Sequence, residues 1–200
     1  MRGIFIAIEG IDVDSELAKA RWNLARRIEK KYNAPYKTCH EVTEYWSDGE
    51  DDFNNLLGRE EFKPIERLAI EIANHAIKYR EDIQPKLNQG EHVVATNFIA
   101  STYASQYKNW ETITNLQKII CNKIILPTLT FILNIEAQAK YKHQTHNEMR
   151  KKKIGYLKYA RQHMSTHIIN ANQPTEKINL DIWKHVNARL EYRTSLFNKE

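Results

Sequence analysis

Ile4-Phe5-Ile6-Ala7-Ile8-Glu9-Gly10-Ile11-Asp12 is the stretch that decides the fold of this chain. Its apolar run is short and rich in isoleucine, and it breaks at a glycine, which is the pattern of a buried strand that ends in a turn. A helical pattern follows over 15–31, and Asp14 or Ser15 is suited to cap its first turn. We therefore expect a strand, a tight turn and a helix at the start of the chain.

A strand, a glycine turn and a helix in this order hold a phosphate group when they carry the pattern G-x-x-x-x-G-K-[ST]. The glycines let backbone N–H groups approach the phosphate, the lysine reaches its oxygens, and the hydroxyl residue holds Mg²⁺. Counted from Gly10, this chain has Ser15 at the second glycine, Glu16 at the lysine and Leu17 at the hydroxyl residue. The charge at the phosphate position is inverted.

The composition favours one packed domain. The chain has 200 residues, of which 42% are apolar and 28% charged, so it can build a core and disorder is not expected. No apolar run approaches the length of a membrane span, and the N-terminus is a poor signal peptide. Cys39 and Cys121 provide no disulfide framework. We expect a single domain over residues 1–200 that works in the cytoplasm without membrane contact.

Strand and helix patterns alternate along the chain. Strands are expected over 4–8, 36–42, 92–95, 129–133 and 166–170, and helices over 15–31, 64–85, 99–106, 112–123, 137–162 and 174–197. This alternation predicts an α/β fold, a three-layer structure in which a parallel five-stranded sheet is flanked by helices on both faces. Ligands of such sheets bind at the carboxyl ends of the strands.

Three of the expected helices carry apolar residues at helical spacing. The helix over 64–85 has a stripe that belongs to the core or to a dimer face, formed by Leu68, Ile72, Ala76 and Tyr79. The closing helix has the stripe Ile182, Trp183, Val186 and Leu190, and the first helix has Leu17, Trp22, Leu24, Ala25 and Ile28 broadly on one side.

Five segments resemble, in order and spacing, the motifs of thymidylate kinases. FIAIEGID at 5–12 is similar to F-I-x-x-E-G-I-D, and IQPKLNQGEHVV at 83–94 to I-x-P-A-L-x-x-G-x-x-V-[IV]. STYASQ at 101–106 resembles S-S-x-A-Y-Q, PTLTFILNI at 127–135 resembles P-D-L-T-x-x-L-D-V, and GYL at 155–157 matches G-Y-L. The resemblance implies the P-loop nucleoside monophosphate kinase fold, with a short basic lid-like segment around 139–155.

The family transfers the γ-phosphoryl group of ATP to dTMP, a reaction that depends on cations and Mg²⁺ ligands. At the matching positions most of these groups are missing here. Glu16 and Leu17 replace the P-loop lysine and hydroxyl residue, Thr96 and Asn97 replace the Asp-Arg pair after the central strand, Asn74 and His75 replace a helical Asp-Arg pair, and Glu71 or a neighbour replaces a stacking aromatic. The residues that remain are Glu9, Asp12, Gln106 and Tyr156, with Glu44 in the stretch that resembles the T-x-E-P loop.

This pattern leads us to expect a pseudoenzyme that keeps the kinase fold and binds a partner or supports an assembly. At an effective dielectric near 20, a unit charge pair about 4 Å apart is worth about 4 kcal/mol. Exchanging Lys for Glu at the phosphate position should therefore strongly weaken the binding of a phosphate group. Asp12, Asp14 and Glu16 surround a helix N-terminus, which favours negative charge, and so take the electrostatic role of the phosphate. No cofactor is expected, and the family implies a homodimer.

Two alternatives remain open. The first is an active or weakly active dTMP or deoxynucleoside monophosphate kinase, dependent on ATP and Mg²⁺, whose phosphate-binding residues have moved elsewhere. The second is a nucleotide- or nucleic-acid-binding module that uses the basic lid, formed by Lys140, Lys142, Arg150, Lys151, Lys152 and Lys153, and the net charge of +5 is compatible with it. The same cluster can equally be a solvated helix face.

We expect no metal site. His143 with His146, and His163 with His167, have helical spacing suited to a metal, but no acidic or Cys partner lies close in the sequence. The acidic stretch over 48–52 has the wrong order for a calcium loop.

Overall fold

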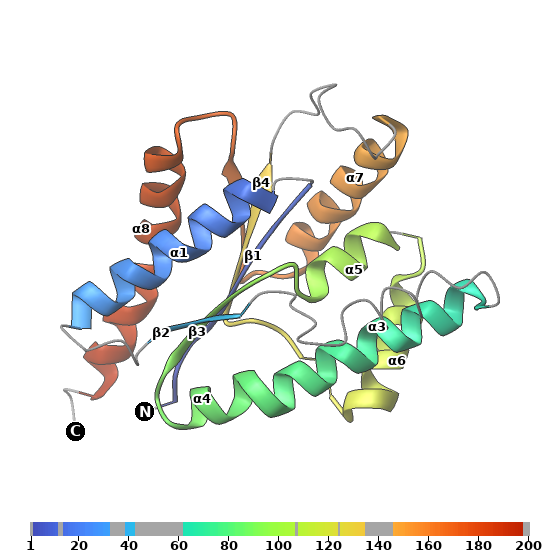
Figure 1. Cartoon of the computed structure of the whole chain (residues 1–200), viewed down its shortest axis with the longest axis horizontal. Coiled ribbons are helices and arrows are strands. Elements are labelled where there is room, and N and C mark those ends of the chain that lie inside the picture. The colour runs from blue at the N-terminus through green and yellow to red at the C-terminus, as the bar shows by residue number, and fades with distance from the viewer. Residues whose placement is uncertain are drawn as a thin grey trace.

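The computed structural model describes residues 2–11, 14–32, 39–42, 62–106, 108–123, 125–134 and 146–197. A five-stranded parallel sheet runs through the molecule in the order β2-β3-β1-β4-β5 (Figure 1). Its strands are β1 (Phe5–Gly10), β2 (Cys39–Val42), β3 (His92–Thr96), β4 (Leu129–Asn134) and β5 (Thr166–Asn170). The predicted α/β architecture with a parallel five-stranded sheet is confirmed.

The central strand β1 is buried along its whole length and pairs with β3 on one side and β4 on the other. Ile6 lies opposite Val94, and Ile8 lies opposite Phe131. Because side chains alternate between the faces of a strand, β1 contributes side chains to two cores, one on each side of the sheet. Phe5 and Ala7 belong to the first, whereas Ile6 and Ile8 belong to the second.

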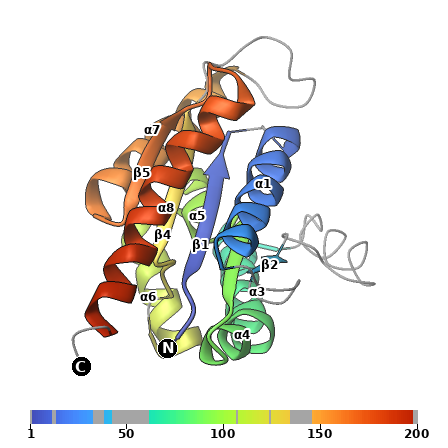
Figure 2. The ribbon, with the colours of Figure 1, turned by 90° about the vertical axis from the view of Figure 1, so that its left-hand side faces the viewer.

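Helices α1 (Asp14–Tyr32) and α8 (Thr175–Phe197) cover one face of the sheet and lie side by side (Figures 1 and 2). They bury Leu24 and Ile28 from α1 and Ile182 and Val186 from α8 against it. The predicted stripe of α8 is confirmed, but Trp22 is 51% exposed, so the stripe of α1 does not include it.

The opposite face carries α3 (Pro64–Lys78), α5 (Ile99–Ser105), α6 (Trp110–Cys121) and α7 (His146–Gln162). Leu68, Ile72 and Tyr79 of the predicted stripe are buried in this core. Gly155 allows α7 to approach α5 closely, because a Cβ at this position would lie 2.3 Å from the carbonyl oxygen of Ala104. None of the helices described is long and apolar enough to cross a membrane.

The long helical segment that begins at Pro64 continues beyond the point we predicted. After α3 the chain makes a π-helical turn, η1 (Tyr79–Ile83), and then α4 (Gln84–Asn88). Pro85 does not end the helix, because it occupies the first turn of α4, where a missing N–H costs little. The segment ends instead at the turn of Gly90, whose φ of 87° suits glycine.

Candidate functional site

The candidate site lies where β1 and β3 end, beside α3, α5 and α7 (Figure 1). Carboxyl ends of parallel strands are the place where ligands bind in sheets of this kind. Gly10 closes β1, and Thr96 and Asn97 close β3. Thr96 is buried, and Asn97 adopts a φ of 50°, a left-handed conformation that Asn tolerates better than most residues.

Glu9 holds the turn after β3. Its carboxylate is fully buried, and its Oε1 accepts a hydrogen bond of 2.9 Å from the backbone N–H of Phe98. Phe98 is the residue that precedes α5, so the carboxylate fixes the entry into that helix. Glu9, which by resemblance corresponds to the glutamate of the motif F-I-x-x-E-G-I-D, is therefore bonded to the backbone of its own chain.

Tyr156 joins α7 to the end of β1. Its side chain is 1% exposed, and its hydroxyl donates a hydrogen bond of 3.1 Å to the carbonyl oxygen of Gly10. This contact exists because Gly155, the preceding residue, lets α7 pack onto α5. The first glycine of the phosphate-loop pattern is thus bonded to a tyrosine of the same chain.

A chain of three polar side chains, which we call the inner network, connects α3 to α5. The hydroxyl of Thr102 donates to Oε1 of Glu71 at 2.5 Å, and Nε2 of His75 lies 3.2 Å from the same hydroxyl. Since a hydroxyl has a single hydrogen, which goes to Glu71, Nε2 of His75 must be the donor in the second bond. The inner network is therefore satisfied with a neutral imidazole.

Burial sets the protonation states of the inner network. His75 is 5% exposed, and this desolvation, together with the charge of Lys78, lowers its pKa from 6.5 to about 4. Burial raises the pKa of Glu71, against the opposing effects of its bond to Thr102 and the charge of Lys152. His75 packs edge-on against the ring of Phe98 at 4.9 Å. The imidazole of His75 is therefore neutral near pH 7.

In the segment that resembles a phosphate loop, a strand is still followed by a helix. β1 ends at Gly10 and α1 begins at Asp14, so only residues 11–13 form the connection. Ser15, Glu16 and Leu17 lie in the first turns of α1, while Asp12 and the side chains of residues 12–18 lie outside the described part. At these positions the sequence has Glu for the lysine and Leu for the hydroxyl residue of the phosphate-loop pattern.

The remaining predicted site residues lie outside the inner network or outside the described part of the chain. Asn74 is half-buried on α3. Gln106 ends α5, where its N–H bonds to the carbonyl of Thr102 at 3.1 Å and its Oε1 accepts from Asn109 at 3.4 Å. The structure does not describe Glu44, Lys140 and Lys142.

The described part of the basic lid lies on α7. Arg150 and Lys151 are exposed, whereas Lys152 and Lys153 are half-buried. Of these, Lys152 is close enough to Glu71 to affect its pKa. Its positive charge therefore lies near the inner network.

His163 and His167, one of the two pairs with metal-like spacing, each lie against a different aromatic ring. His163 lies against Tyr159 with ring centroids 4.1 Å apart, and His167 stacks on His185 at 3.9 Å. The residues that the structure describes contain no group of three possible metal ligands. His143 and the side chain of His146 are outside them.

Sequence reasoning missed the inner network as a unit. The spacing of Glu71 and His75, four residues apart on a helix, indicates that they share a face. Nothing local indicates that Thr102, 27 residues beyond His75, bridges them.

The fold and the position of the site define a protein of the P-loop nucleoside monophosphate kinase type. A sequence model described as thymidylate kinase matches residues 51–182 of the 200, and the chain belongs to this family. Its fold is also that of the crystal structure of thymidylate kinase from Ehrlichia chaffeensis, with a TM-score of 0.74, 21% identity, and coverage of 93% of this chain and 99% of that one. A comparison with curated proteins gives no match.

Proposed function

We propose that this chain is a thymidylate-kinase-like pseudoenzyme, which has lost ATP-dependent phosphoryl transfer and acts by binding a protein partner or within an assembly. One observation carries the proposal: neutral or acidic residues occupy the positions of the family's cations. They are Glu16 in the phosphate loop, Asn97 after β3 and His75 on α3. Phosphoryl transfer consists mainly of positioning and charge neutralisation, so the loss of these cations removes most of the catalysis.

The inner network supports the proposal from a second direction. In an apolar interior, a polar group that lacks a partner costs about 1–3 kcal/mol, and a ligand normally supplies the partner at a binding site. Here Glu71, Thr102 and His75 bond to one another, and Tyr156 bonds to Gly10. These groups have hydrogen-bond partners without a nucleotide, as expected of a fold that is retained after its catalytic activity is lost.

The apolar surface of α3 and α6 supports a homodimer. These two helices pack side by side, and Ile77 of α3 is 46% exposed while Ile119 of α6 is 78% exposed. Exposed isoleucines on adjacent helices favour burial against a second copy, and the family resemblance implies packing of helices. Light scattering should give the mass of a dimer, and Ile119→Asp should shift it to that of a monomer.

The decisive experiment is a phosphotransfer assay with ATP, dTMP and Mg²⁺ at high protein concentration. We expect no dTDP above the level of the protein-free reaction. The double variant Glu16→Lys/Leu17→Ser is expected to stay inactive, because Asn97 and His75 remain. Clean dTDP production by the wild-type protein would contradict the proposal.

One observation favours a second candidate, a deoxynucleoside monophosphate kinase with relocated cations. The charge of Lys152 on α7 acts to lower the pKa of Glu71, so a cation lies near the inner network although the helical arginine is missing. Were the wild-type protein active, Lys152→Ala should abolish turnover, while Lys153→Ala on the same helix should have little effect. ATP and Mg²⁺ would be required in that case only.

A further inference from the structure

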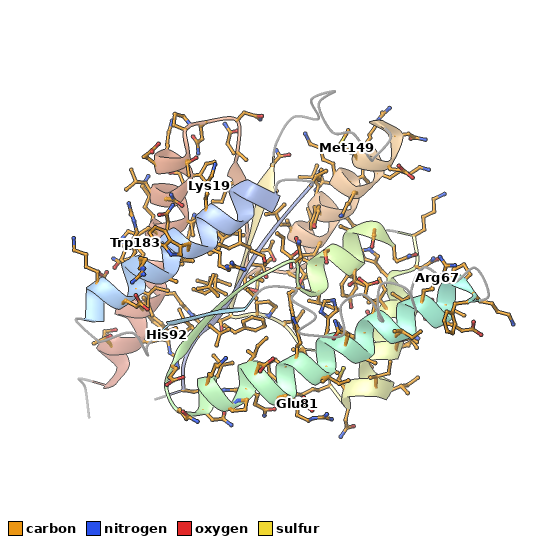
Figure 3. All side chains as sticks on the ribbon, viewed as in Figure 1. Lys19, Arg67, Glu81, His92, Met149 and Trp183 are labelled. Atoms are coloured by element: carbon orange, nitrogen blue, oxygen red, sulfur yellow. The ribbon has the colours of Figure 1, made fainter. Side chains whose placement is uncertain are left out.

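A basic groove lies on the face of the sheet that is opposite the candidate site, between α1 and α8. Two adjoining hollows of about 320 and 360 Å³ form it, and they share Arg27 and Lys30. The residues that line this α1–α8 groove include Arg26, Arg27, Lys30, Lys31, Asn179 and Trp183. Figure 3 shows Trp183 of α8 beside α1.

The positive charge of the α1–α8 groove is only partly neutralised. Arg26 pairs with Glu29 at 3.6 Å, and Lys31 pairs with Glu191 at 3.2 Å. No described acidic side chain pairs with Arg27 or Lys30, and Glu176 is the acidic residue that lines the groove. The two central cations are thus available to an anionic ligand.

One further side chain gives the α1–α8 groove a feature that a plain basic surface lacks. Trp183 is half-buried, packs against the core below and borders the hollow with Arg27 and Lys30.

A second indole lies nearby on α1. Trp22 is 51% exposed, and the guanidinium of Arg26 lies 5.3 Å from its ring centroid. Cations beside exposed aromatic rings are the combination with which proteins hold unpaired nucleotides, because phosphates meet the cations and bases stack on the rings.

We propose that the α1–α8 groove binds a single-stranded nucleic acid. Arg27 and Lys30 contact phosphates, and Trp183 stacks on a base. A duplex offers no unstacked base to Trp183, and an acidic peptide does not present an aromatic ring beside every negative charge as a nucleic acid strand does. The groove is independent of the proposed loss of catalysis, because α1 and α8 pack on the other face of the sheet from the inner network.

Fluorescence anisotropy of a labelled dT oligonucleotide with the full chain tests this proposal. For a single strand, the logarithm of the binding constant changes by about −0.7 per contacted phosphate for each logarithm of salt concentration. With Arg27 and Lys30 on one phosphate each, and one or both of the flanking cations Arg26 and Lys31 on a further phosphate each, we expect a slope of about −2 to −3.

Two double variants with the same loss of charge locate the surface. Arg27→Ala/Lys30→Ala should weaken binding at least tenfold in low salt and reduce the slope by about 1.4, the share of two phosphates. Lys151→Ala/Lys153→Ala, on the basic lid of α7, should leave the affinity within about twofold. Thermal unfolding of both variants verifies that they fold.

A third substitution separates stacking from charge. Trp183→Leu keeps an apolar side chain against the core but removes the ring, so we expect at least a fivefold loss of affinity with the salt slope unchanged. Trp183→Phe, which keeps an aromatic ring, should recover most of the lost affinity.

Three results would overturn the proposal. One is the absence of saturable binding in low salt. Another is a loss of binding in the α7 variant but not in the groove variant, which would place the nucleic acid on the lid. The third is equal competition by duplex DNA or by polyglutamate, which would show that the groove attracts any polyanion.

Discussion

The inner network satisfies its polar side chains within the protein, whereas the α1–α8 groove leaves its own open. Glu71, Thr102 and His75 are joined by two hydrogen bonds, and the histidine is held neutral. In the groove, no described acidic side chain pairs with Arg27 or Lys30. Hydrogen-bonded groups such as those of the inner network stabilise a fold, and unpaired cations such as those of the groove are open to an anionic ligand.

The largest effect on stability is expected where α7 carries Tyr156 into the site. Gly155→Ala would place a Cβ 2.3 Å from the carbonyl oxygen of Ala104, so two backbones must move apart. We expect a loss of at least about 3 kcal/mol in the free energy of unfolding, measured with urea. Lys153→Ala on the same helix is the control, and a Gly155→Ala protein as stable as wild type would show that α7 is not held against α5 as described.

The second effect is a dependence of stability on pH. In the unfolded chain His75 gains a proton below about pH 6.5, but in the folded protein burial lowers its pKa to about 4. Between these values the unfolded state binds more protons, so stability decreases as the pH falls. The contribution of His75 to this loss of stability between pH 6.5 and 4 is about 3 kcal/mol, because each unit of pKa difference corresponds to about 1.4 kcal/mol.

The comparison of wild type with His75→Gln isolates this contribution, because glutamine keeps an N–H donor for Thr102. The variant should lose less stability between pH 6.5 and 4 than wild type does. Of the groups near His75, Lys78 and Phe98 do not titrate there, whereas Glu71 has a raised pKa and works in the opposite direction. His92, whose pKa burial also lowers to about 4, leaves a residual slope in both proteins. Equal pH slopes would show that His75 is not held neutral by burial.

The third effect concerns the bridge of the inner network. Thr102→Val conserves the shape of the side chain but removes the hydroxyl that links Glu71 to His75. We expect a loss of about 1–3 kcal/mol, since the buried His75 and the half-buried Glu71 lose a partner. Ser105→Ala, one turn further along α5, removes a hydroxyl that bonds only to backbone carbonyls and should cost less than half as much. Equal losses in the two variants would rule out a special role for Thr102.

Most of the fold follows from local patterns, but the two regions do not. The predicted strand over 166–170 is confirmed at Thr166–Asn170, because apolar β-branched residues between turns allow little else. The bridge of Thr102 and the approach of Lys152 to Glu71 depend on how α5 and α7 pack on α3, which no local spacing encodes. On α1 alone, Arg27 and Lys30 form an ordinary basic helix end, and only the arrival of α8 makes them part of a groove.

The smallest effect is expected from the groove. Arg27 and Lys30 are three residues apart on a helix and have no described acidic partner, so they repel each other weakly. Arg27→Ala/Lys30→Ala should therefore leave the free energy of unfolding unchanged or raise it by about 0.5 kcal/mol, in contrast to the loss expected for Thr102→Val. Urea unfolding at low salt, where the repulsion is least screened, is the measurement that checks it. A destabilisation of more than about 1 kcal/mol would mean that these cations hold α1 to α8, and the contrast between the two regions would disappear.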